Sequence, residues 1–116
     1  MRKLVLITIV SALAISSCTF EKAVPLPAGC TTTMYYEADI KPFIDSKCVT
    51  CHSSVPSYMN GGDFSSFSLL KEKIDDGSLV DRVFNKKDMA PVGYDQLTEA
   101  EKAMLKCWIE QGAPNN

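Results

Sequence analysis

Apolar and polar positions along the chain follow the three- and four-residue spacing of helices. Residues 39–51 form the first such segment, and Asp39 is its expected N-cap. Pro42 falls in the first turn, where its missing N–H does no harm. The residues on the apolar face are Ile40, Phe43, Ile44, Cys48 and Cys51. The pattern therefore predicts a helix with both cysteines near its C-terminal end.

Two further helices are expected after a loop rich in Ser, Pro and Gly. Ser65 or Ser66 can cap the second helix, which should end near Gly77. Residues 78–84 carry a short apolar stripe and predict a third helix. Residues 85–96 lack a helical period and contain Met, Pro and Gly, so we expect them to form a loop.

The last helix has the clearest boundaries in the sequence. Thr98 and Glu101 form a capping box at its start, and Gly112 with Pro114 forms a stop signal at its end. The amphipathic stripe between them consists of Met104, Leu105, Cys107, Trp108 and Gln111. No alternating strand pattern of useful length occurs. The chain is expected to be all-α, with three or four helices and long loops in a domain over residues 34–116.

The N-terminal region has the features of an export signal. Arg2 and Lys3 precede a mostly apolar run, which ends in small residues before Cys18 and is too short to span a membrane. This ending resembles the lipobox of bacterial lipoproteins, which implies removal of residues 1–17 and lipidation of Cys18. Residues 18–33 lack a helical or strand period and are expected to form an extended tether. A plain signal peptide with an unrelated cysteine is the alternative.

Composition limits the possible partners. The 116-residue chain has a net charge of −2, and removing residues 1–17 takes away two positive charges and no negative one. The mature chain is therefore more acidic still, which argues against binding to nucleic acid. A basic protein partner remains compatible with this charge.

The five residues Cys48-Val49-Thr50-Cys51-His52 form a C-x-x-C-H motif, the attachment pattern of haem c. Residues three and four apart share one side of a helix, so two thiols and one imidazole can address the same ligand. A zinc site would have to use Cys48 and Cys51 with Cys30, Cys107 or His52, but structural zinc sites usually have a second close-spaced ligand pair, which this sequence lacks. A redox dithiol needs a βαβ context that the sequence lacks. A simple disulfide with an uninvolved histidine is the third alternative.

The sixth ligand of the iron is expected to be a methionine. His52 is the single histidine of the sequence, which excludes a second histidine ligand from the same molecule. Met89 lies 37 residues beyond His52, in a proline-containing loop that is long enough to reach the other face of a haem. Met34 precedes the first helix, Met59 is close to His52, and Met104 lies on an apolar helix face. Met89 is therefore the favoured ligand and Met59 the next candidate.

Cys30 and Cys107 are left without a role once lipid and haem are assigned. In an exported protein they are expected to form a disulfide, which would tie the end of the tether to the last helix. The alternative is that Cys107 is a small core residue beside Trp108, with Cys30 free or paired between molecules.

The order of these features resembles the class I c-type cytochromes, and in particular small bacterial lipoprotein cytochromes. The similar segments are Met89-Ala90-Pro91, Leu97-Thr98-Glu99-Ala100-Glu101 and Trp108-Ile109-Glu110-Gln111-Gly112-Ala113. Ala90 departs from the usual proline, and Cys107 stands where an ordinary core residue is common. The resemblance implies a cytochrome c-like domain with one covalent haem, in which Phe43 or Ile44 lies against Leu105 and Trp108.

A haem iron with histidine and methionine ligands has no open position for a substrate. We therefore expect an electron-transfer protein rather than an enzyme, namely a monomer that exchanges single electrons with redox partner proteins. It would be lipid-anchored in the bacterial cell envelope, with its haem domain facing the periplasm or the exterior. Thr19 replaces the Asp that commonly retains lipoproteins at the inner membrane, which favours the outer membrane. A haem-based ligand sensor or a peroxidase-like module is the alternative if the distal ligand is labile.

Overall fold

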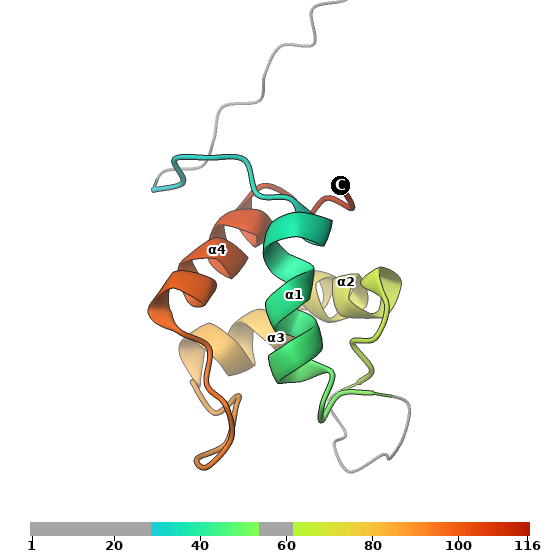
Figure 1. Cartoon of the computed structure of the whole chain (residues 1–116), viewed down its shortest axis with the longest axis vertical. Coiled ribbons are helices and arrows are strands. Elements are labelled where there is room, and N and C mark those ends of the chain that lie inside the picture. The colour runs from blue at the N-terminus through green and yellow to red at the C-terminus, as the bar shows by residue number, and fades with distance from the viewer. Residues whose placement is uncertain (1–28, 54–61) are drawn as a thin grey trace, which may run out of the picture.

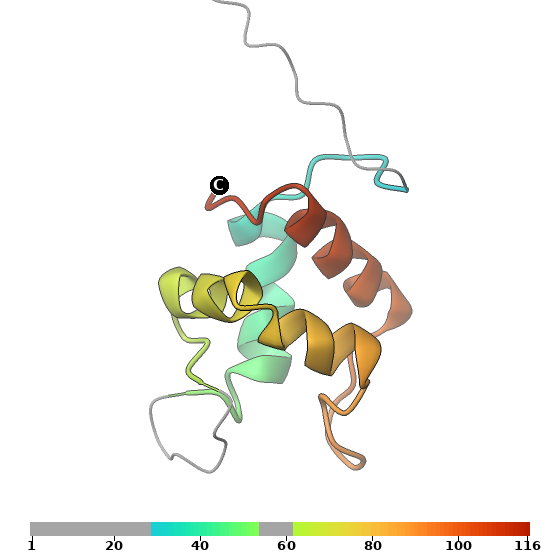
Figure 2. The same cartoon turned by 180° about the vertical axis from the view of Figure 1, so that it is seen from behind.

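The computed structural model describes residues 29–53 and 62–116, and within these ranges every regular element is helical. The expected all-α class is therefore confirmed for this part of the chain. Figures 1 and 2 show a first helical segment at the centre, with α4 (Glu99–Glu110) on one side of it. The helices α2 (Phe67–Asp75) and α3 (Ser78–Val80) lie behind the first segment in the view of Figure 1. The predicted signal, Cys18, most of the tether and Met59 lie outside the described residues.

The first helical segment runs from Tyr36 to Cys48. Its centre is α1 (Lys41–Phe43), which is flanked by the wider π-helical turns Tyr36–Ile40 and Ile44–Cys48. The prediction that Asp39 caps this helix is wrong, because the helix starts three residues earlier and Asp39 lies inside its first turn. From there the Asp39 carboxylate accepts a hydrogen bond of 2.8 Å from the backbone N–H of Tyr35.

The early start of this helix follows from the burial of Tyr36, which is 3 % exposed. Its ring stacks on Trp108 of α4, with centroids 5.5 Å apart and an angle of 24° between the planes. The ring of Phe67 meets Tyr36 edge-on at 5.0 Å. An aromatic cluster of this kind stabilises the turn that carries it, so tertiary packing extends the helix beyond its local capping signal.

The second and third helices follow the predicted positions closely. Ser66 is the N-cap residue of α2, although its hydroxyl makes no capping hydrogen bond to the backbone. Gly77 adopts a left-handed conformation with φ of 78°, which ends α2 and allows α3 to begin directly after it. Helix α3 continues directly into a π-helical turn at Asp81–Asn85. The combined helix ends one residue after the predicted end at residue 84.

Both boundaries of α4 agree with the sequence signals. The Thr98 hydroxyl accepts from the backbone N–H of Glu101, and the Glu101 carboxylate accepts from the backbone N–H of Thr98 at 2.7 Å. At the other end Gly112 has φ of 94°, as a helix stop requires.

One buried cluster joins all of these helices. Phe43, Ile44, Leu105 and Trp108, which the cytochrome resemblance brought together, all belong to it. The indole N–H of Trp108 donates to the Pro114 carbonyl at 3.0 Å, so the fully buried ring has its polar atom satisfied. The first helical segment and α4 therefore share one core.

Residues 30–34 are fastened to the C-terminal end of α4. Cys30 and Cys107 form a disulfide with Cα atoms 5.6 Å apart. The Gln111 side chain accepts from the backbone N–H of Met34 at 2.9 Å and donates to the Thr32 carbonyl at 3.0 Å. The last residues of the expected tether are thus part of the folded domain. Within the described ranges, no helix is both long and apolar enough to cross a membrane.

Candidate cofactor site

A largely apolar pocket lies at the end of the molecule away from the disulfide. It is enclosed by the end of the first helical segment, the helix of α3, the loop before α4 and the first turns of α4. The empty volume of the pocket is about 700 Å³, and this value includes space that is open to solvent. Apolar side chains that line it include Ile44, Phe64, Leu79, Val83, Leu97 and Leu105.

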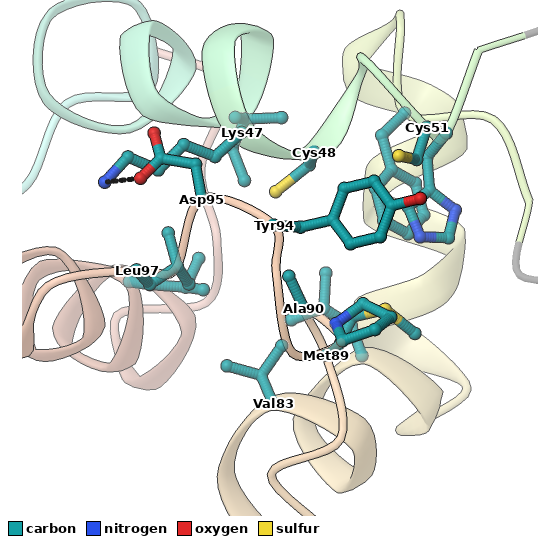
Figure 3. A pocket seen from close by; sticks show the side chains of 15 residues that line it. Lys47, Cys48, Cys51, Val83, Met89, Ala90, Tyr94, Asp95 and Leu97 are labelled. Carbon is teal, nitrogen blue, oxygen red and sulfur yellow. Dashed lines mark ion pairs between the residues drawn. The ribbon is translucent and has the colours of Figure 1, made fainter.

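All three residues of the C-x-x-C-H motif line this pocket. The first helical segment ends at Cys48, and the backbone N–H groups of Cys51 and His52 both donate to the Cys48 carbonyl, at 3.1 and 2.8 Å. This tight turn replaces the predicted helical continuation to Cys51, and it still turns all three side chains toward the pocket. Cys48 and Cys51 are free thiols. Figure 3 shows them at the end of the helix, with the Tyr94 side chain reaching toward them from the loop.

His52 is held in one orientation. It is 5 % exposed, and its Nδ1 lies 3.0 Å from the Gly62 carbonyl oxygen. Because a carbonyl can only accept, Nδ1 is the protonated nitrogen in this hydrogen bond, and in the neutral tautomer with this proton Nε2 is the nitrogen with the lone pair. The Phe64 ring stacks on the imidazole, with centroids 4.4 Å apart and 17° between the planes. A backbone carbonyl on Nδ1 is the kind of partner that orients a metal-ligating histidine.

The thiol of Cys48 is not activated by its surroundings. Burial raises its pKa to about 11, and the nearby Glu101 carboxylate adds to this effect. A redox-active dithiol depends on the opposite, a cysteine with a lowered pKa. The environment of Cys48 therefore argues against the dithiol alternative.

Met89 reaches the same pocket from the loop before α4 (Figure 3). Of the other methionines that the structure describes, Met34 and Met104 pack against the hydrophobic core and are not among the residues lining the pocket. Met59 lies outside the described residues. The structure thus brings together Cys48, Cys51, His52 and Met89, whereas Cys30 and Cys107 lie at the other end of the domain.

The conformation of the loop that carries Met89 depends on Gln96. Its side-chain amide donates to the carbonyl groups of Ala90 at 2.9 Å, Pro91 at 3.0 Å and Tyr94 at 3.3 Å. One amide group thereby holds three loop carbonyls in place. The sequence carried no signal for this role, because a glutamine in a loop has no characteristic motif.

Lys47 connects the first helical segment to the loop and to α4. Its ammonium group donates to Glu101 at 2.8 Å and to the Gln96 carbonyl at 3.0 Å. It also lies 3.9 Å from the Asp95 carboxylate, an ion pair that Figure 3 shows. The hydrogen bond that Lys47 donates to Glu101 raises the pKa of Lys47. Burial alone would raise the pKa of Glu101, but the donors Lys47 and Thr98 outweigh it and lower that pKa. Sequence analysis had assigned Glu101 to the capping box alone.

The donor set fits a covalently attached haem better than a zinc ion. Within residues 29–53 and 62–116 no three His, Cys, Asp or Glu side chains gather as a metal-binding group, and Cys30 and Cys107 are used in the disulfide. Zinc would therefore lack its usual four ligands. The pocket offers two thiols, an imidazole lone pair and a thioether within apolar walls, which are the groups that a covalent haem requires.

No family model, curated protein or solved structure matches this chain. The residues that line the pocket are therefore the basis for inferring a function.

Proposed function

We propose that this protein is a monohaem c-type cytochrome, a membrane-tethered carrier of single electrons in the bacterial cell envelope. The observation that carries the proposal is the convergence of Cys48, Cys51, His52 and Met89 on one apolar pocket. When bound, the haem supplies one-electron exchange between ferric and ferrous iron.

Each of these residues has a distinct part in the proposal. Cys48 and Cys51 would form thioether bonds to the porphyrin, and the raised pKa of the Cys48 thiol argues against thiol–disulfide exchange there. His52 would ligate iron through Nε2 while the Gly62 carbonyl keeps Nδ1 protonated. Met89 would be the second protein ligand to the iron, and a thioether ligand favours the reduced state relative to a nitrogen ligand. The apolar walls would exclude water from the iron.

Covalent attachment is tested by extraction of the purified protein with acidified organic solvent. We expect the haem to stay on the polypeptide, and we expect Cys48→Ser and Cys51→Ser each to lower the yield of holoprotein. Haem that passes fully into the solvent from the unaltered protein would refute the proposal.

The role of Met89 is tested by its replacement with alanine. Met89→Ala should remove the methionine-to-iron charge-transfer band of the ferric protein and lower the reduction potential, whereas Met59→Ala should do neither. The reverse result would make Met59 the ligand. Rapid binding of carbon monoxide by the unaltered ferrous protein would instead favour the ligand sensor or peroxidase-like module.

Anchoring through Cys18 is the remaining part of the proposal, and it is motivated by the lipobox-like sequence before that residue. Cys18→Ser should release the protein from the membrane fraction, since the anchor would be the lipid. A variant that stays in the membrane fraction would show that something else holds it there.

A further inference from the structure

A second cavity adjoins the apolar pocket, and it has a different character. The two share five lining residues, namely His52, Phe64, Leu79, Val83 and Met89. The remaining walls of the second cavity are polar and consist of Lys73, Asp76, Ser78, Asp81, Arg82 and Lys86. The space beside His52 and Met89 therefore passes from apolar walls to charged walls.

Three cations from two neighbouring helices face this second cavity. Lys73 belongs to α2. Arg82 lies in the π-helical turn that continues α3, Lys86 is the C-cap residue of that turn, and both side chains line the second cavity. Two carboxylates, Asp76 and Asp81, also line it, so cations outnumber carboxylates.

Arg82 retains free donor capacity in this arrangement. Its Nε donates to Asp88 at 2.6 Å, and the two terminal amino groups carry the other four of the five N–H donors of a guanidinium. Lys86 pairs with Asp81 at 2.6 Å, and Lys73 lies 3.4 Å from Asp76 and 3.5 Å from Glu72. An ammonium group has three donors, so one or two carboxylate partners leave at least one donor for a further acceptor.

We infer that Lys73, Arg82 and Lys86 form the site for the two carboxylate side chains of the porphyrin, an inference that rests on the proposed function. A haem is amphiphilic: its disc is apolar and its two carboxylates lie on one edge. The apolar pocket matches the disc. The second cavity, where three cations outnumber two carboxylates among the lining residues, matches the edge that bears the haem carboxylates. Arg82 is the principal partner, because a guanidinium binds a carboxylate through two parallel hydrogen bonds.

The test uses holoprotein in which the haem carboxylates carry ¹³C, so that their infrared bands can be assigned in oxidised-minus-reduced spectra. Arg82→Gln should shift the labelled carboxylate bands and lower the reduction potential, because a cation near the haem favours electron uptake. Arg82→Lys should restore part of the potential. Lys86→Gln and Lys73→Gln should produce smaller shifts in the same direction, and they keep the test available if Arg82→Gln does not accumulate.

Lys102→Gln is the matched control. Lys102 is also paired with a carboxylate, that of Glu99 at 2.8 Å, and it lines neither of the two cavities. This variant should leave the labelled bands in place. Covalent haem with carboxylate bands that do not move in the variants of Lys73, Arg82 and Lys86 would overturn this inference alone. A purified protein without covalent haem would overturn it together with the proposed function.

Discussion

The two ends of the domain are built in different ways. The fastened end consists of residues 30–34, the last turns of α4 and the residues after it. The pocket end consists of residues 48–52, the loop at residues 86–97 and the first turn of α4. Figure 1 shows them at opposite ends of the first helical segment. That segment has thirteen residues, which corresponds to roughly 20 Å at 1.5 Å per residue.

At the fastened end the protein completes its own core. Tyr36 stacks on Trp108, and the indole N–H of Trp108 donates to the Pro114 carbonyl. The Cys30–Cys107 disulfide links residue 30 to α4 at the same end. At the pocket end apolar side chains surround a space, and the polar groups of Lys47 and Gln96 hold the surrounding segments together. A small domain buries a limited share of its surface, so an apolar cofactor at the pocket end would complete the core there.

The largest expected effect comes from removing the cofactor attachment. In the Cys48→Ser/Cys51→Ser double variant, amide hydrogens in residues 79–85 should exchange with solvent faster by about tenfold or more. The reason is that the proposed haem would no longer fill the space between the pocket walls. Amides in the last turn of α4 should change much less. Hydrogen exchange followed by mass spectrometry measures both. An equal increase at the two ends would mean that they fold as one unit.

The next effect concerns the fastened end. The disulfide closes a loop with a sequence separation of 77 residues, and on the chain-entropy model its loss from Cys30→Ser/Cys107→Ser costs about 4 kcal/mol at most. The proposed covalent haem would also restrain the unfolded chain and so reduce this value. Urea unfolding measures the loss, and the visible spectrum of the proposed haem should stay unchanged. Peptide mass analysis of the unreduced, alkylated protein should find Cys30 and Cys107 linked; two alkylated cysteines would contradict the bridge.

A smaller effect is expected for the ion pair of Lys47 and Glu101, whose side chains are 14 % and 18 % exposed. The pKa of Glu101 is lowered, so its contribution to stability is complete above its unfolded pKa and is lost as the pH falls through the lower, folded pKa. The pKa of Lys47 is raised, so its contribution is lost only as the pH rises through a value above 10.5.

Lys47→Gln should therefore lower the thermal midpoint at neutral pH, and the difference from the unaltered protein should shrink in acid below the pH at which Glu101 is protonated. Lys41→Gln is the matched control, because its partner Asp45 is exposed and such pairs contribute little. A difference that persists unchanged in strong acid would assign the effect of Lys47→Gln to packing rather than to charge.

The smallest effect is expected at the start of α4. Thr98→Ala should destabilise the protein by about 1 kcal/mol, since it removes the hydroxyl that accepts from the Glu101 backbone. Thr98→Ser keeps the hydroxyl and should be nearly neutral. Chemical denaturation of the two variants measures the difference, and equal stabilities would show that the hydroxyl contributes nothing.

Some features of this protein are determined by the sequence alone, because the residues that create them are neighbours in the chain. The capping box joins residues three apart, Gly77 and Gly112 act through their own backbone angles, and the C-x-x-C-H spacing brings its side chains to one side through a single turn. These signals determine where α2 ends, where α4 begins and ends, and where the pocket-lining motif lies.

Other features were decided by tertiary structure alone. Asp39 has the sequence of an N-cap, yet the stacking of Tyr36 on Trp108 moves the start of the helix away from it. Lys47 meets Glu101 across 54 residues, and the three carbonyls that Gln96 binds converge only because the loop is folded back on itself. Local signals act through a few covalent links, whereas these contacts depend on how the helices pack, and sequence spacing does not record that packing.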